Sequence, residues 1–185
     1  MGTINKKSFT LIELIVAVGV IGLILPTVFN IFFTMIRQQL VLVSYQEIKH
    51  QGDSIQTNIK NILQNRAGYI SNSDYSAIDV CPLPLTPTPT FSPQLFIKDR
   101  EGNKIHIYPT PLSLSSSGVA SESATFNKIY YLSSKDVSVI NLGFSCYKIN
   151  EFSPVVVSTS FTVQKSTQFK DVTLPYSFKV RLRNY

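Results

Sequence analysis

The sequence predicts an α+β protein in which one long N-terminal helix, apolar in its first half and amphipathic in its second, packs on an antiparallel β-sheet. Three observations predict this fold. An uncharged apolar run lies near the N-terminus, an amphipathic stretch follows at residues 37–66, and residues 67–185 alternate short β-rich runs with turn residues. We therefore expect a β-rich head domain at residues 67–185, in which the amphipathic half of the helix covers the apolar face of the sheet.

The apolar run is long enough to cross a bilayer. Leu14 to Ile36 holds 23 residues without a charge, which is about 35 Å as a helix. A secretory signal peptide is the competing interpretation, but its apolar stretch would be shorter and would end in a small-x-small cleavage site. Lys6 and Lys7 precede the run, so the positive-inside rule predicts a cytoplasmic N-terminus and an extracytoplasmic head.

One carboxylate, that of Glu13, stands at the start of this apolar run. A charged side chain in hydrocarbon costs a few kcal/mol, so an acid there predicts a function and a partner. One interpretation is that Glu13 lies near the membrane surface and its side chain reaches the membrane–water interface, since five residues of helix cover only about 7 Å. The other is that it pairs with an ammonium created at Phe9 by cleavage after Ser8, in its own chain or a neighbour.

The residues Lys6-Lys7-Ser8-Phe9-Thr10-Leu11-Ile12-Glu13 and the apolar helix behind them resemble the prepilin signal of the type IV pilin superfamily. That superfamily includes pilus subunits and the pseudopilins of type II secretion. The resemblance implies that residues 1–8 are a leader peptide, which a prepilin peptidase removes between Ser8 and Phe9. It also implies methylation of the new Phe9 amine and a transmembrane helix at residues 9–36 that becomes the filament core. The family usually has Gly before the cut, whereas this chain has Ser8.

The resemblance also implies the partners and the location of the chain. Glu13 matches the acid that in the family pairs with the N-terminal amine of an adjacent subunit during assembly. The expected partners are other pilin or pseudopilin subunits, the prepilin peptidase, the inner-membrane assembly platform, and lipid before assembly. The expected location is the cytoplasmic membrane, crossed once, and then an extracellular or periplasmic filament. No cofactor is expected.

Gly19, Gly22 and Pro26 weaken the apolar helix. Proline removes a backbone hydrogen bond, and glycine costs about 1 kcal/mol relative to alanine, so this stretch is able to bend or melt locally. The two glycines also permit close approach of neighbouring helices. In a lone anchor they would be tolerated kinks; in a pilin-like filament, as the resemblance suggests, they would let the buried helices repack.

The amphipathic half, residues 37–66, carries an apolar stripe that alternates steps of four and three residues and should pack on the head domain. The predicted helix ends near Arg66, because Ala67-Gly68 provides a C-terminal glycine signal. The stripe consists of Val41, Tyr45, Ile48, Gly52, Ile55, Ile59 and Ile62.

Several loops follow from turn residues. Residues 72–74 predict a turn, and the run from Cys81 to Pro93, with five prolines in thirteen positions, predicts an extended loop. Residues 113–123 hold six serines and predict a mobile surface loop. Residues 100–103 predict the turn of a hairpin. Asp99, Glu101 and Asn103 alternate there as in a calcium loop, but no bidentate acid follows, so a turn is the better interpretation.

The strands are expected where Val, Ile, Phe and Tyr are enriched. They should form an antiparallel sheet with one buried face and one solvent-exposed face. Three stretches, at residues 139–144, 155–157 and 178–184, also resemble the larger minor pilins and the J-type minor pseudopilins, which favours an accessory subunit over a bulk filament subunit. The expected strands are 94–99, 104–108, 125–132, 137–149, 155–164 and 172–182.

Cys81 and Cys146 are the only cysteines. In an oxidising compartment two cysteines favour a disulfide, although free buried cysteines are also common, and the sequence leaves both alternatives open. His50 and His106 share no ligand spacing with them, so no metal site is expected.

The net charge is +6, and the head domain is mildly basic. Its one local cluster is Lys179, Arg181 and Arg183, which a strand would place on one face because side chains alternate. A solvated face that discourages edge pairing is the favoured interpretation, and binding of DNA phosphates is the other.

No catalytic motif is present in the sequence, which lacks a nucleophile elbow, a phosphate-binding glycine loop and an acidic pair. We therefore expect a structural subunit, and no enzyme, assembled through its N-terminal helix. The alternative is a single-pass anchored adhesin or DNA receptor that acts outside a filament. The sequence does not choose among pilus, secretion and DNA-uptake systems, between major and minor subunits, or among ligands for the head.

Overall fold

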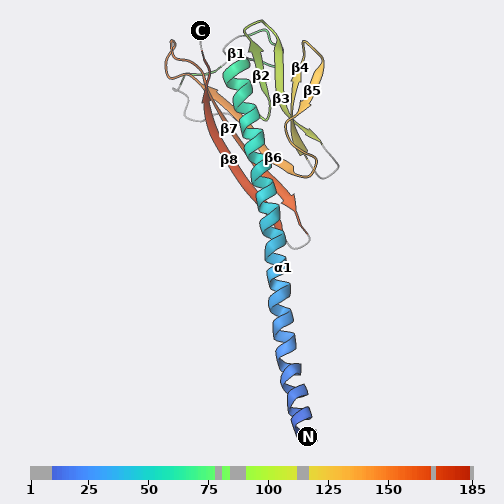
Figure 1. The fold of residues 1–185 in the computed structure, drawn as a ribbon. Coiled ribbons are helices and arrows are strands. Elements are labelled where there is room, and N and C mark those ends of the chain that lie inside the picture. Colours follow the sequence, from blue (N-terminus) through green and yellow to red (C-terminus); the bar gives the residue numbers. More distant parts are fainter. Residues whose placement is uncertain (1–9, 78–80, 84–90, 112–116, 168–169, 184–185) are drawn as a thin grey trace, which may run out of the picture. The chain divides into compact units, whose positions relative to one another are not determined.

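The computed structural model describes residues 10–77, 81–83, 91–111, 117–167 and 170–183, and the chain forms two compact units, residues 1–42 and 43–185. Residues 11–42 of the first unit are helical, and the second unit contains the end of the helix and all the strands that the structure describes (Figure 1). The fold is the predicted α+β, pilin-like layout of one long N-terminal helix and antiparallel sheets. The elements are α1 (Leu11–Asn61), η1 (Ile62–Arg66), β1 (Ala67–Ser71), β2 (Leu95–Asp99), β3 (Lys104–Pro111), β4 (Ser117–Ser123), β5 (Lys128–Tyr131), β6 (Ser138–Tyr147), β7 (Val156–Ser166) and β8 (Asp171–Arg181).

The second unit has two antiparallel sheets, where we expected one. The first has the order β1-β2-β3-β4-β5 and the second the order β6-β7-β8, so each is a meander of consecutive strands. The chain changes sheet after β5, because β6 pairs with β7 and not with β5. Ser117 connects the sheets, donating from its hydroxyl to the carbonyl of Val139 and from its N–H to the hydroxyl of Ser138.

The amphipathic half of α1 contributes the core of the second unit as its spacing predicts. Ile48, Ile55 and Ile59 are fully buried, and Gly52 is buried with them. The stripe is shifted at its two ends, where Ser44 is buried in place of Tyr45 and Leu63 in place of Ile62. The shift at the C-terminal end coincides with η1, since the wider π-helical turn changes which side chain faces the sheets.

The helical segment ends at Arg66 as predicted, but the predicted glycine cap is wrong. Ala67, the C-cap, has an extended φ of −65° and ψ of 120°, and it and Gly68 already belong to β1. Gly68 lies at an irregularity in the pairing of β1 with β2, where a Cβ would lie 3.2 Å from the Lys98 carbonyl oxygen. Gly68 therefore lets two strands approach each other closely, and it does not act as a left-handed helix cap.

The hairpin of β2 and β3 is confirmed, with Leu95 opposite Ile107 and Ile97 opposite Ile105. Its turn is closed by Asp99, whose carboxylate accepts hydrogen bonds from Glu101 N–H at 2.9 Å and Asn103 N–H at 2.7 Å. Residues 99–103 thus form the expected turn.

The serine-rich segment after Leu112 was predicted to be a loop, and for residues 117–123 that prediction is wrong. These residues form β4, which lies between β3 and β5, and its centre at Val119 and Ala120 is fully buried. Small side chains allow this strand to pack closely, and Ser121 is itself buried. Residues 113–116 lie outside the described residues. Serine content predicted solvent exposure, but the cross-strand pairing decided the conformation.

The other strands differ from their predicted bounds mainly at the ends. The predicted run 137–149 contains β6, whereas β7 extends two residues beyond the predicted 155–164 and β8 begins one residue before the predicted 172–182. The run 125–132 contributes only the four residues of β5, all of them exposed, because Thr125 to Asn127 form a turn. β1 had no predicted counterpart. Pro175 lies within β8, the outer strand of the second sheet, where a missing N–H costs no ladder bond.

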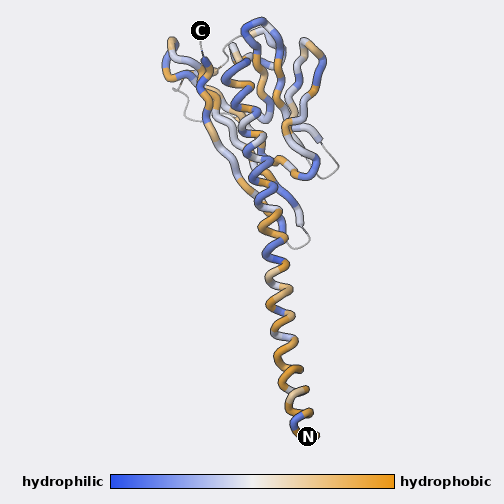
Figure 2. Tube along the Cα trace, viewed as in Figure 1, coloured by the Kyte–Doolittle hydropathy of each residue, from blue (hydrophilic) through white to orange (hydrophobic). Residues whose placement is uncertain are grey.

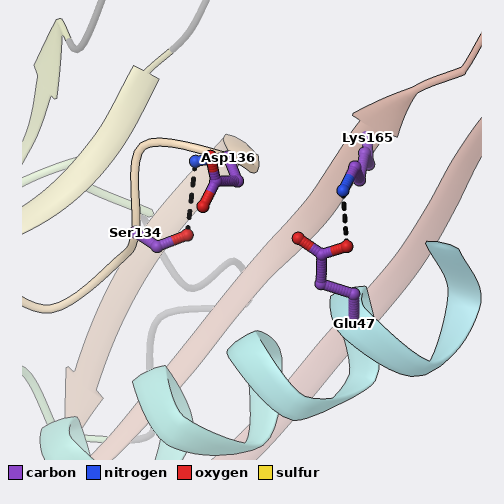
Figure 3. Close-up of polar contacts among 4 residues, drawn as sticks. All are labelled: Glu47, Ser134, Asp136 and Lys165. Carbon is purple, nitrogen blue, oxygen red and sulfur yellow. Dashed lines mark hydrogen bonds and ion pairs between the residues drawn. The ribbon is translucent and has the colours of Figure 1, made fainter. Parts of the chain in front are cut away.

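Two cross-links hold distant segments of the second unit together. Cys81 and Cys146 form a disulfide with a Cα–Cα distance of 5.2 Å and a sequence separation of 65 residues. Glu47 of α1 accepts a charged hydrogen bond from Lys165 of β7 at 2.5 Å (Figure 3). Both ends of this ion pair are partly solvated, so it contributes on the order of 1 kcal/mol or less.

Candidate functional site

The candidate site is the apolar surface of the first unit. Every residue from Thr10 to Leu40 is exposed, and consecutive apolar residues make up most of this segment (Figure 2). The helix is long and apolar enough to cross a membrane, with a mean hydropathy of 2.5 over its most apolar window. Soluble proteins rarely expose contiguous apolar area of this size, so this surface indicates contact with lipid or with other helices.

Glu13 lies in the first turn of α1, where Thr10 binds its carboxylate. The Oε2 atom accepts hydrogen bonds from the Thr10 N–H and the Thr10 hydroxyl, each at 3.0 Å. In return, the Glu13 N–H donates to the Thr10 hydroxyl oxygen at 3.4 Å. The other carboxylate oxygen, Oε1, has no hydrogen-bond partner among the described residues. One oxygen thus stabilises the helix start while the other remains available to a further donor.

Thr10 is the residue of this site that we did not single out from the sequence. It is the N-cap in a capping box, the S/T-x-x-E pattern in which a hydroxyl and a carboxylate three residues apart satisfy each other's backbone N–H groups. Thr10-Leu11-Ile12-Glu13 matches this pattern, so the signal was visible in the sequence. The pattern has its own structural explanation for an acid at position 13, independent of any partner.

The predicted cleavage site lies outside the described residues. This holds for Ser8 and Phe9, and equally for the basic pair Lys6 and Lys7. The pairing of Glu13 with an amine at Phe9 therefore stays a prediction.

Gly19 and Gly22 have no structural reason within the described chain. A Cβ at either position would meet no other heavy atom within 4 Å. Glycine lowers helix stability by about 1 kcal/mol relative to alanine, so these residues weaken α1 without improving its own packing. They leave two places where the backbone of another helix can approach closely.

Pro26 lies inside α1, which continues through it. Proline has no N–H, so the carbonyl of Gly22, four residues earlier, lacks its helical donor. Next to it, the Thr27 hydroxyl donates to the carbonyl of Ile24 at 2.6 Å, which adds a second local change to the backbone hydrogen bonding. The glycines and this proline together weaken the helix at residues 19–27.

The basic residues predicted on one strand face are exposed and alternate with buried ones. Lys179, Arg181 and Arg183 are exposed, whereas Phe178, Val180 and Leu182 are buried. Lys179 lies over the ring of Tyr147 at 5.9 Å from its centroid.

His50 and His106 belong to no metal-ligand cluster among the described residues. His106 stacks between Phe96 and Tyr108, with centroid distances of 4.2 and 4.5 Å, and desolvation lowers its pKa. Within the described part of the chain, no group of three or more His, Cys, Asp or Glu residues is placed to hold a metal ion.

Comparisons with known proteins add no relative to this description. The sequence matches no protein-family model, and neither the curated proteins nor the solved structures contain a match to it.

Proposed function

We propose that this chain is a structural subunit, of the minor or accessory kind, of a type IV pilus or a related secretion or DNA-uptake pseudopilus. In this proposal a prepilin peptidase removes residues 1–8, the Phe9 amine is methylated, and the apolar helix moves from the membrane into a filament core. The chain acts by assembly and interaction, without catalysis.

One observation carries the proposal: an exposed apolar helix with a single acid whose Oε1 atom has no partner among residues 10–183 as far as the structure describes them. Lipid offers no donor for a carboxylate, so Glu13 is stable in an apolar surrounding only if a positive group reaches it. A methylated amine at the start of a neighbouring subunit has the required positive charge. In the proposed filament it would lie at the same depth in the apolar core as Glu13. Gly19 and Gly22 support the proposal, because they permit the helix contacts that a filament core requires.

The test compares substitutions at Glu13. Glu13→Gln keeps the shape and the hydrogen-bond acceptor but removes the charge; we expect normal membrane insertion and loss from the sheared filament fraction. Glu151→Gln, an exposed acid in the turn after β6, is the matched control and should assemble normally. Normal incorporation of Glu13→Gln would contradict the proposal.

A second measurement concerns the N-terminus. Mass spectrometry of polymerised material should find a chain that begins at a methylated Phe9. An intact Met1 in cells that contain a prepilin peptidase would favour the alternative, a plain anchor for an adhesin or DNA receptor.

A further inference from the structure

A polar groove in the second unit has no role in the assembly proposed above. Its volume is about 1010 Å³. A smaller hollow of about 320 Å³ adjoins it and shares Asn65, Arg66, Asp99, Asn103 and Phe126 with it. The larger groove lies between the C-terminal end of the helix and the strands β3, β4 and β5. Together they form an extended open depression, a shape that suits a linear polymer better than a compact small molecule.

Three asparagines line the groove from the helical side. Asn58, Asn61 and Asn65 follow one another at steps of three and four residues, which places them on one face. Asparagine is a poor helix former, because its side chain competes with the backbone for hydrogen bonds. None of the three side chains makes a hydrogen bond to another described residue. Their amides therefore face the groove as unused donors and acceptors, in a position where they weaken the helix.

The π-helix η1 lies at this same place. Ile62, Asn65 and Arg66 belong to it and line the groove. Single π-helical turns are rare and occur frequently at functional sites, because they lower helix stability and redirect side chains. The π-helical turn and the asparagines are thus two independent departures from the most stable helix, and both are found at the groove.

Two basic residues, Arg66 and Lys128, and one acid, Asp99, line the larger groove, whereas Arg100 and Glu101 add one charge of each sign to the smaller hollow. Arg66 and Lys128 make no ion pair with a described residue. Asp99 also lines the groove, but its carboxylate already accepts three hydrogen bonds from the turn, two of them from Asn103. A ligand in the larger groove therefore meets two cations that have no ion-pair partner among the described residues, several amides, and one carboxylate whose oxygens the turn already engages. The small excess of positive charge favours an anionic molecule with many hydrogen-bonding groups.

Three exposed aromatic side chains complete the lining. Phe126 and Tyr131 are each 65% exposed, and Tyr130 is 57% exposed. Rings at the rim of a polar groove provide flat apolar surfaces, and Tyr130 also provides a hydroxyl. The apolar face of a sugar ring packs well on such a surface.

We propose that this groove binds an acidic oligosaccharide. The asparagine amides hydrogen-bond to sugar hydroxyls, Arg66 pairs with a carboxylate of the ligand, and Phe126 and Tyr130 stack on pyranose rings. A nucleic acid is the less suitable occupant, because non-specific binding of a phosphate backbone depends on many cations and the groove has two. This binding does not require filament assembly, so either proposal can fail without the other.

The test is isothermal titration of the full chain in micelles of a detergent without a sugar headgroup. The probes are tetragalacturonate, the neutral cellotetraose of equal length, and single-stranded oligothymidylate. We expect saturable binding of tetragalacturonate with a Kd on the order of 0.1–1 mM, and about tenfold weaker binding of cellotetraose.

Variants identify the groove. Arg66→Gln and Asn61→Ala should each weaken tetragalacturonate binding about tenfold. Asn61→Ala raises helix propensity, so its effect cannot come from unfolding of α1. Lys135→Gln and Gln46→Ala, which replace exposed residues away from the groove, should bind as the unsubstituted chain does.

Three results would overturn the proposal. They are the absence of saturable tetragalacturonate binding up to about 10 mM, binding that the groove variants leave unchanged, and tighter binding of oligothymidylate with a steep salt dependence.

Discussion

The ring of Tyr176 occupies the space into which a side chain at position 52 would project, so Gly52 of α1 and Tyr176 of β8 are in direct contact. A Cβ placed on Gly52 would overlap the Tyr176 ring. The Tyr176 hydroxyl donates to the Lys49 carbonyl at 3.0 Å, and the ring stacks on Phe161 at a centroid distance of 5.1 Å. The absence of a side chain at one helix position therefore fixes how closely α1 approaches the second sheet.

Gly52→Ala should destabilise the second unit. The added methyl group forces Tyr176 or the helix to move, which costs about 1–3 kcal/mol as overpacking. This cost should exceed the gain in helix propensity of about 1 kcal/mol. Thermal unfolding of the full chain in micelles measures the effect. Gly19→Ala is the control, since no heavy atom lies within 4 Å of its Cβ, and it should not lower the melting temperature.

Tyr176 should make stability fall at high pH. Desolvation, followed by the nearby Asp53 carboxylate, raises its pKa from about 10 to about 12. The folded state thus favours the neutral phenol, and this contribution is fully present below pH 10 and is lost as the pH rises from about 10 to about 12. Tyr176→Phe should remove this part of the pH dependence in denaturant titrations. An unchanged profile would show that Tyr176 does not titrate in that range.

The disulfide should account for a large part of head stability. In the chain-entropy description, closing a loop of this length stabilises the fold by about 4 kcal/mol. Replacing Cys81 and Cys146 by serine should lower the free energy of unfolding by an amount on that order, measured by urea denaturation with and without a reductant. The reductant should affect only the unsubstituted protein, which separates loss of the bond from poor packing of serine.

Thr10→Val should loosen the start of α1 without removing the Glu13 charge. The valine side chain keeps the shape of threonine but cannot donate to the carboxylate or accept from the Glu13 N–H, whereas the backbone N–H of residue 10 can still donate to the carboxylate. Loss of an N-cap side chain costs about 1 kcal/mol. Hydrogen exchange should speed up for the amides of the first turn. Thr34→Val, which removes a hydroxyl that bonds to the Asn30 carbonyl within the same helix, should leave that turn unchanged.

Pro26→Ala tests whether the weak part of the helix is used in assembly. Alanine restores the donor for the Gly22 carbonyl and favours the helix by about 3 kcal/mol. We expect normal insertion and processing but a lower yield of filaments, because the helix can no longer adjust. Val28→Ala, an exposed position near Pro26, is the control and should polymerise normally. Equal filament yields would contradict a role for local helix unfolding in the proposed assembly.

The sequence predicted the elements whose signal is local. Ile48, Ile55 and Ile59 follow the helical period and are buried, and the alternation around the turn at residues 100–103 located β2 and β3. Glu13 was identified because an acid in an apolar run is costly wherever the chain folds.

The errors arose where partners distant in the sequence decided the outcome. β4 is a strand because β3 and β5 flank it, which its own serine-rich composition does not reveal. Gly68 lets β2, about thirty positions away in the chain, approach closely, and it does not cap the helix. The groove joins the end of α1 to residues 99–132, so no single window of the sequence could have indicated it.

Pro175 limits the routes by which copies of this chain can join. A growing sheet needs an uninterrupted row of N–H and C=O groups on its outermost strand, and proline leaves a gap in that row halfway along β8. Lateral recruitment of further strands, the usual route to amyloid-like aggregates, is therefore blocked on this side. Addition of a strand to either sheet would instead have to use β1, β5 or β6, the edge strands that contain no proline.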